Sequence, residues 1–207
     1  MGTIISKFKP AQLFMLITLA GILFVSGCAR YSRNVNTLYE PSAAVRGGTG
    51  EVYVVVPESV QTRSPDIKWV LGKVRDDDNN NIDEVTSPSS PAEIIQGAFV
   101  LEFKKAGYTA IPTTKRPAAE QRVIDLTVTE IELDQISDFA DLKANCRVHV
   151  GIDVFENGQL IKRLQYVATS SRTDIKDRDM LARIVLEEAL QSVMLKAVPE
   201  LHSLFKQ

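Results

Sequence analysis

Few side chains in this sequence are suited to catalysis or to holding a catalytic metal. The chain has two histidines, His149 and His202, and neither lies in a His-Glu-x-x-His pattern that would place two imidazoles on one helical face. Cys146 and His149 are three residues apart in an alternating segment, so they fall on opposite faces of the predicted strand and form no cysteine–histidine nucleophile. A Gly-x-Ser-x-Gly elbow, a Walker loop and a Gly-x-Gly-x-x-Gly fingerprint are also missing. We therefore expect no enzyme, no cofactor and no catalytic or metal-ligating residue.

An acidic and amide-rich stretch from Asp76 to Glu84 is the one segment that suggests an ion site. Calcium prefers several carboxylate and amide oxygens, and a calcium loop beginning at Asp76 would place Asp78 and Asn80 at ligand positions. The same numbering puts Asn81 where the loop needs glycine and Ser87 where it needs a bidentate glutamate. The pattern therefore favours a solvated acidic loop over a metal site.

A positively charged and then apolar segment begins the chain. Lys7 and Lys9 precede an apolar run from Leu13 to Val25, and no acidic residue lies before that run. The run has 13 residues, whereas a membrane-spanning helix needs about 20. A short run with these flanks is typical of a secretory signal peptide, which we place at residues 1–27.

The end of the apolar run carries a second signal. Val25-Ser26-Gly27-Cys28 is a branched aliphatic residue, two small residues and a cysteine, and it resembles the lipobox of bacterial lipoproteins. The resemblance implies cleavage between Gly27 and Cys28, with a diacylglycerol thioether and an N-linked acyl chain such as palmitate on Cys28. At about 0.8 kcal/mol per buried methylene, two or three acyl chains hold a protein firmly to a membrane. The alternative is an ordinary secreted protein whose Cys28 is free or in a disulfide.

The residues after Cys28 indicate to which membrane the cleaved lipoprotein would be sorted. In lipoproteins an aspartate directly after the cysteine favours the inner membrane, so Ala29 implies a lipid-anchored protein of the outer membrane that faces the periplasm. From Ala29 to Gly50 the sequence is polar and small, with Pro41 and three glycines and no sustained apolar period. We therefore predict a lipidated flexible tether at residues 28–50 and a single domain at residues 51–207.

The net charge and the cysteine content limit the kinds of partner that the chain can bind and the disulfides that it can form. Without the leader the chain has 22 basic and 26 acidic residues, a net charge of −4, and no basic patch suited to nucleic acid. If Cys28 is acylated, Cys146 has no partner within the chain for a disulfide. Cys146 alternates with Val148 and Val150, so we interpret it as a small core residue and not as a reactive thiol.

The first half of the domain combines short apolar runs with one strong helix signal. The sequence predicts a strand at Glu51–Pro57 and a second extended piece at Ile67–Val74. Ser90 and Glu93 form a capping box around Pro91, and Gly107 follows two lysines, which together predict a helix over residues 91–106.

The sequence of the second half of the domain predicts three strands and a helix. A strand over residues 123–133 has a change of parity that suggests a bulge near Glu130. Strands at 145–155 and 159–170 should form a hairpin, because Asn157-Gly158 supplies the positive φ angles of a two-residue turn. A final helix over residues 174–197 should kink or end at Pro199. The predicted fold is α+β: one mainly antiparallel sheet of four to five strands with two helices packed on one face.

Several short motifs together resemble the YajG-like family of uncharacterised bacterial lipoproteins. They are the lipobox, Leu71-Gly72-Lys73-Val74-Arg75, Lys105-Ala106-Gly107-Tyr108 and the final Leu204-Phe205-Lys206-Gln207. The family has no established catalytic residues, so none carries over to this chain. The order of elements is also similar to that of accessory lipoproteins in envelope assembly and transport systems, which is an analogy of fold alone.

These observations favour a non-catalytic outer-membrane lipoprotein that acts as an envelope binding or accessory module. Its partner would be an envelope protein, a cell-wall polymer or a lipid. One alternative is an accessory subunit of a lipid or lipopolysaccharide transport complex, and another is a periplasmic hydrolase. Trp69, Tyr53, Phe155 and Tyr166 are candidates for ligand contact, although aromatic side chains on strands more often belong to the core.

Overall fold

The structure is a computed structural model that describes residues 33–36, 38–42, 44–62, 64–117, 121–137, 141–174 and 178–206. Contacts divide the chain into two units, residues 1–31 and residues 32–207, and all described elements belong to the second. The folded unit therefore begins well before position 51, where the sequence placed the domain boundary.

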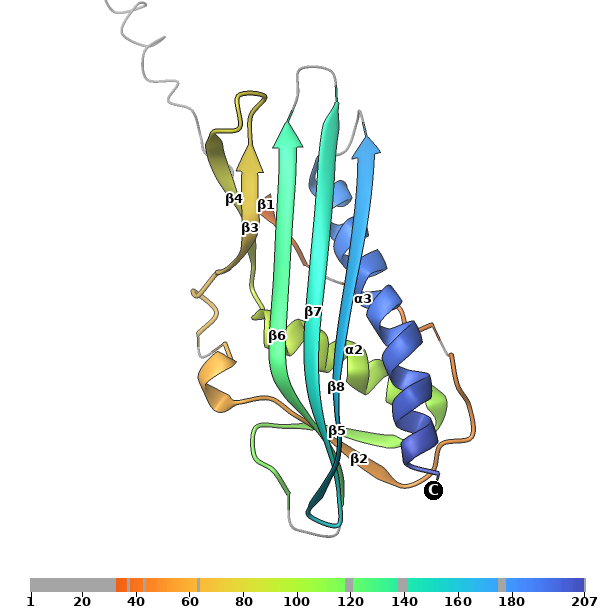
Figure 1. The fold of residues 1–207 in the computed structure, drawn as a ribbon. Helices are drawn as coiled ribbons and strands as arrows, with labels where there is room; N and C mark the ends of the chain where they lie inside the picture. Colours follow the sequence, from red (N-terminus) through yellow and green to blue (C-terminus); the bar gives the residue numbers. More distant parts are fainter. Residues whose placement is uncertain are drawn as a thin grey trace, which may run out of the picture. The chain divides into compact units, whose positions relative to one another are not determined.

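Within the described residues, eight strands form one mixed sheet (Figure 1). They are β1 (Arg33–Asn34), β2 (Glu51–Val55), β3 (Trp69–Arg75), β4 (Asn81–Ser87), β5 (Thr109–Thr113), β6 (Arg122–Ser137), β7 (Leu142–Glu156) and β8 (Gln159–Asp174). The pairs β1–β4, β2–β5, β2–β6 and β3–β6 are parallel, and β3–β4, β6–β7 and β7–β8 are antiparallel. The prediction of a mainly antiparallel sheet with four to five strands is therefore wrong.

Strand β6 joins the two halves of the sheet. Its first residues, 122–125, pair with β2, and its last residues, 133–136, pair with β3 on the same edge. Its other edge pairs with β7 from end to end. The backbone of β3 approaches closely at Gly72, since a Cβ there would lie 1.7 Å from the carbonyl oxygen of Leu133. Only glycine fits this contact, and it lets β3 lie against the second half of β6.

Two helices cover one face of the sheet, as predicted (Figure 1). Helix α2 (Pro91–Ala106) packs on β2, β5 and β6, and α3 (Arg178–Leu204) packs on β7 and β8. The predicted capping box and terminator of α2 are confirmed, because Ser90 and Glu93 bond reciprocally and Gly107 is left-handed with φ 108°. Neither helix is apolar enough over a sufficient length to cross a membrane.

The predicted hairpin between β7 and β8 is confirmed, with φ angles of 51° at Asn157 and 75° at Gly158. Three other predictions differ from the structure. Asn81–Glu84 belongs to strand β4 and not to the acidic loop, and the register shift of β6 lies between Leu126 and Val128 instead of near Glu130. Helix α3 continues through Pro199. The carbonyl that Pro199 leaves without a donor belongs to Leu195, which lies on the exposed side of the helix.

The described part of residues 28–50 is not a free tether. After β1, the described residues 38–42 and 44–50 contact both helices before β2, and we call them the strap. The buried carboxylate of Glu102 on α2 accepts hydrogen bonds from the Tyr39 hydroxyl and the Ser42 backbone N–H, both at 2.6 Å. Gly48 donates its backbone N–H to the Ala106 carbonyl at 2.9 Å. The polar, glycine-rich composition suggested flexibility. In the structure it instead allows the strap backbone to approach helix α2 closely.

We expect Gly72→Ala to destabilise the fold strongly, because the new methyl group meets backbone that no side-chain rotation can move. The free energy of unfolding should fall by about 3 kcal/mol or more in urea titrations. Gly97→Ala in α2 is the matched control, since a Cβ there meets nothing within 4 Å, and it should raise stability by about 0.5–1 kcal/mol. Equal stability of the two variants would contradict the close β3–β6 contact.

Candidate functional site

Two of the residues singled out in the sequence, Gly27 and Cys28, lie outside the described residues, so the structure does not test the predicted cleavage and acylation. The second cysteine is described. Cys146 points into the core with 1% of its surface exposed, and burial raises the pKa of its thiol to about 12. A thiol that holds its proton so firmly is a poor nucleophile at neutral pH.

The four aromatic candidates do not form one contact surface. Tyr53 and Phe155 share a row of the sheet, each paired opposite Val123, and the Arg116 guanidinium stacks 3.9 Å from the centre of the Phe155 ring. Trp69 donates its indole N–H to Thr62 Oγ1 at 2.8 Å. Their hydrogen bonds and stacking make these side chains structural.

Tyr166 lies on the other face of the sheet, where it packs against the core under α3. Its hydroxyl donates to Glu200 Oε2 at 2.7 Å, and burial together with this carboxylate raises the pKa of the tyrosine. The hydroxyl is therefore committed to joining β8 to α3, and it faces away from Tyr53 and Phe155.

A groove of about 820 Å³ crosses four strands of the sheet. Its lining comes from β3, β6, β7 and β8 and from neither helix, so it lies on the face that the helices leave open. On β7, Asn145 and Arg147 alternate with the buried Ala144, Cys146 and Val148, so their side chains point into this open face. We call this hollow the open-face groove.

Charged and hydroxyl side chains line the open-face groove together with apolar ones such as Leu71 and Ile131. Arg75 pairs with Asp134 at 3.2 Å, and Arg147 pairs with Glu132 at 3.4 Å. Lys73 adds a third cation that forms no ion pair among the described residues, so the lining has one positive charge more than negative. The lining also contains hydroxyl and amide groups, from Asn145, Thr169 and Ser171.

No pattern in the sequence indicates this groove. Alternation within each strand indicates which side chains face outward, but the groove depends on which residues of four strands lie in one row. Lys73, Asp134, Asn145 and Ser171 form one such row, through the pairings of β3 with β6, β6 with β7 and β7 with β8. Only the β7–β8 register follows from a local signal, the Asn157-Gly158 turn.

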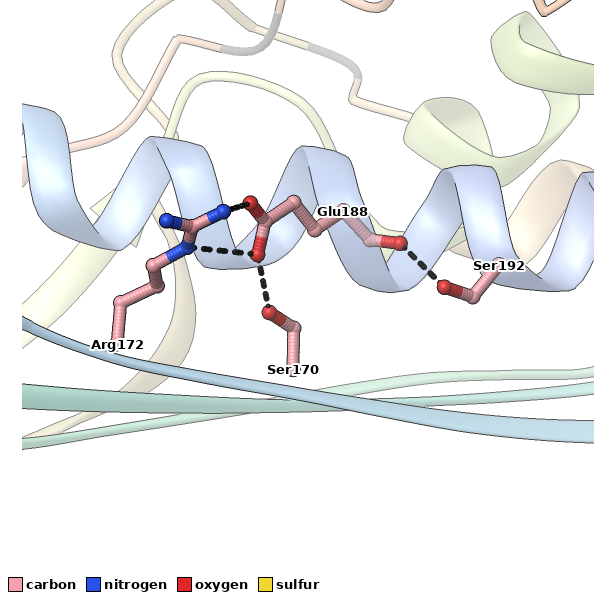
Figure 2. A network of polar contacts seen from close by, with 4 residues as sticks. All are labelled: Ser170, Arg172, Glu188 and Ser192. Carbon is pink, nitrogen blue, oxygen red and sulfur yellow. Dashed lines mark hydrogen bonds and ion pairs between the residues drawn. The ribbon is translucent and has the colours of Figure 1, made fainter.

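A polar network behind the groove fastens β8 to α3 (Figure 2). Glu188 on α3 forms an ion pair with Arg172, and Ser170 donates its hydroxyl to Glu188 Oε2 at 2.6 Å. Ser192 donates to the Glu188 backbone carbonyl at 2.8 Å and so stays within the helix. The hydrogen bonds from Arg172 and Ser170 lower the pKa of Glu188. With every oxygen of this carboxylate engaged, the network is a structural clamp.

The acidic stretch forms a tight turn between β3 and β4. The Asp76 carboxylate accepts hydrogen bonds from the Asn80 backbone N–H at 2.7 Å and from the Asn80 side chain at 3.1 Å. Hydrogen bonds from Asn80 lower the pKa of Asp76. Across the described ranges, no three histidine, cysteine, aspartate or glutamate side chains gather as a metal site would need.

The lowered pKa of Glu188 predicts acid sensitivity. Its carboxylate contributes stability above its ordinary pKa of 4.5, and this contribution is lost as pH falls through the lower folded pKa. Glu188→Gln should therefore reduce unfolding free energy by about 0.5–1 kcal/mol at pH 7, and the difference from wild type should shrink below pH 4.5. Glu132→Gln, at the more exposed pair with Arg147, is the control and should change stability by less than about 0.5 kcal/mol. A difference that stays constant down to pH 3 would refute the role of the carboxylate.

No protein-family model and no curated protein sequence matches the chain. Among solved structures, a Xanthomonas campestris protein of the family DUF330 aligns at 15% identity and TM-score 0.47, over 84% of this chain and 96% of its own. A minor lipoprotein from Acinetobacter baumannii aligns at 8% identity and TM-score 0.38, over 74% and 90%. The rare lipoprotein B from Shewanella oneidensis aligns at 9% identity and TM-score 0.33, over 66% and 98%. Similarities of this strength assign neither a family nor a function.

Proposed function

We propose that this chain is a non-catalytic lipoprotein of the bacterial outer membrane, anchored by acyl chains on Cys28 and facing the periplasm. The export and anchoring part rests on the sequence: a charged and then apolar leader that ends in Val25-Ser26-Gly27-Cys28, followed by Ala29. The YajG-like motifs at residues 71–75 and 105–108 favour the same class of protein.

The proposed role is that of a binding or accessory module, and the observation that carries it is the open-face groove. The sheet face that the helices leave open has a hollow of about 820 Å³ lined by residues of four strands. Cavities of such size are typical of binding sites. The module would hold its partner in this groove while the acyl chains hold the module at the membrane.

The lining favours a polar partner, such as a protein surface or a cell-wall polymer. Two ion pairs, one extra cation at Lys73 and the hydroxyls of Thr169 and Ser171 offer hydrogen bonds and charge. Burying these groups against an acyl chain would remove their water without replacing its hydrogen bonds. A subunit of a lipid or lipopolysaccharide transport complex is therefore the weaker alternative, unless it contacts a protein of that complex through this groove.

The described chemistry supports a role without catalysis. The two carboxylates of the groove, Glu132 and Asp134, are engaged with Arg147 and Arg75. The thiol of Cys146 lies under the groove floor with its pKa raised to about 12 by burial. A hydrolase would need a nucleophile and a base within reach of each other.

Anchoring is tested at Cys28. With palmitate labelling and membrane fractionation, wild type should carry the label in the outer-membrane fraction, because its acyl chains bury many methylenes. Cys28→Ala should lose the label and leave the membrane, and Cys146→Ala is the matched control that should keep both. An unlabelled, soluble wild type would refute the lipoprotein proposal and reopen the secreted alternative.

The groove is tested by placing a photo-crosslinking amino acid at Thr169, inside the groove, and at Leu195, which is exposed on α3. We expect a discrete adduct in cells from position 169 and none from position 195. Lys73→Glu should weaken that adduct severalfold because it reverses the charge of the lining, whereas Lys196→Glu on α3 should not. Adducts from position 195 alone would move the binding surface to the helix face and contradict the proposal.

A further inference from the structure

The fold limits how the domain can stand on a membrane, given the proposed acylation of Cys28. We call the β3–β4 turn at residues 76–80 the near end and the β7–β8 turn at residues 156–159 the far end; they lie at the top and bottom of Figure 1. We propose that the near end faces the lipid surface and that the far end points away from it.

The chain joins the sheet from the direction of the near end. Strand β1 pairs in parallel with β4, Arg33 opposite Val85 and Asn34 opposite Thr86, and Val35 donates to the Thr86 carbonyl at 2.7 Å. Parallel strands run the same way, and β4 starts at Asn81, directly after the near-end turn. The chain therefore enters β1 from the near end.

Strand β1 is held firmly against the rest of the domain. Val35 is 3% exposed, within the main hydrophobic core. Beyond it, the strap is held by Glu102 through Tyr39 and Ser42 at 2.6 Å each. Releasing β1 to lengthen the tether would expose Val35 to water and then strain a buried, hydrogen-bonded carboxylate. The chain is therefore fixed to the sheet from Arg33 onward.

The segment from Cys28 to Arg33 is short compared with the distance from Arg33 to the far end of the sheet. Cys28 and Arg33 are five residues apart, so the acylated residue lies within about 18 Å of Arg33 in any conformation. Val85 pairs with Gly72, which shares a row with Leu133 and Cys146, so Arg33 and Cys146 lie at the same height along the sheet. At about 3.3 Å per residue, the near end is roughly 13 Å from this row and the far end roughly 33 Å.

The reach of the tether therefore covers the near end but falls short of the far end by about 15 Å. A domain standing on its far end would need a tether of about nine residues, whereas Cys28 and Arg33 are only five residues apart. The near end also suits contact with headgroups more than with acyl chains, because Asp77 and Asp78 are exposed there and stay hydrated. The lipid surface is the partner that this end faces.

The test measures height above the membrane at three positions of the acylated, full chain in vesicles of zwitterionic lipid. A fluorophore is attached at Asp78→Cys, Thr169→Cys or Gln159→Cys, all at exposed positions, and an acceptor dye is placed in the headgroups. Cys146 is buried and Cys28 acylated, so labelling is selective. We expect quenching to be strongest at position 78, intermediate at 169 and severalfold weaker at 159.

A matched variant carries ten Gly/Ser residues inserted between Tyr31 and Ser32, which lengthens the tether without touching β1. We expect the differences among the three positions to collapse in this variant. Equal quenching at all positions without the insertion, or stronger quenching at 159, would overturn the orientation. An order that survives the insertion would contradict the short tether as its cause. Palmitate labelling of the same samples separates the two proposals, because unlabelled protein would refute the lipid anchor itself.

Discussion

The hydrogen-bonding edges of β6 are the constraint on which the rest of the fold depends. One edge holds β2 at its first residues and β3 at its last, while the other holds β7 along its length. The backbone groups of a buried strand must find partners, so β6 forces segments from both halves of the chain into one sheet. Helix α2 covers the half with β2 and β5, and α3 covers the half with β7 and β8. Without β6 the two halves would share no sheet, and the row of residues that lines the open-face groove would not exist.

Short patterns in the sequence correctly predicted the elements that are determined by interactions between neighbouring residues. The capping box at Ser90 and Glu93 and the left-handed Gly107 define α2, and Asn157-Gly158 defines the long hairpin. Strand β5 was missed because it begins directly after a helix and contains Pro112, a residue that strands tolerate mainly at a sheet edge. Its partner β2 is far away in sequence. The parallel pairs of β6 likewise depend on contacts between distant segments, which no pattern within one strand reveals.

The residues of the candidate site likewise divide into those that a local pattern predicts and those that depend on contacts between distant segments. Alternation predicted correctly that Cys146 faces the core, since that depends only on the strand to which it belongs. The open-face groove needs the register of four strands, so its residues carried no signal of their own. The aromatic set failed for a related reason: Tyr166 faces the helices, whereas Tyr53 and Phe155 share a row on the opposite face. Residue type suggested a contact surface, but the faces on which the strands place these residues separate them.

The strap also sets an order of events for an exported chain. Its partner Glu102 lies 60 residues after Ser42, and Glu187, which accepts the Leu38 backbone N–H, lies 149 residues after Leu38. A chain that emerges N-terminus first delivers Cys28 well before either glutamate. Enzymes that cut and acylate at Cys28 would therefore meet an extended chain whose strap has nothing to bind. If Cys28 is acylated as we propose, the strap would close only after that modification, once both glutamates are available to bind it.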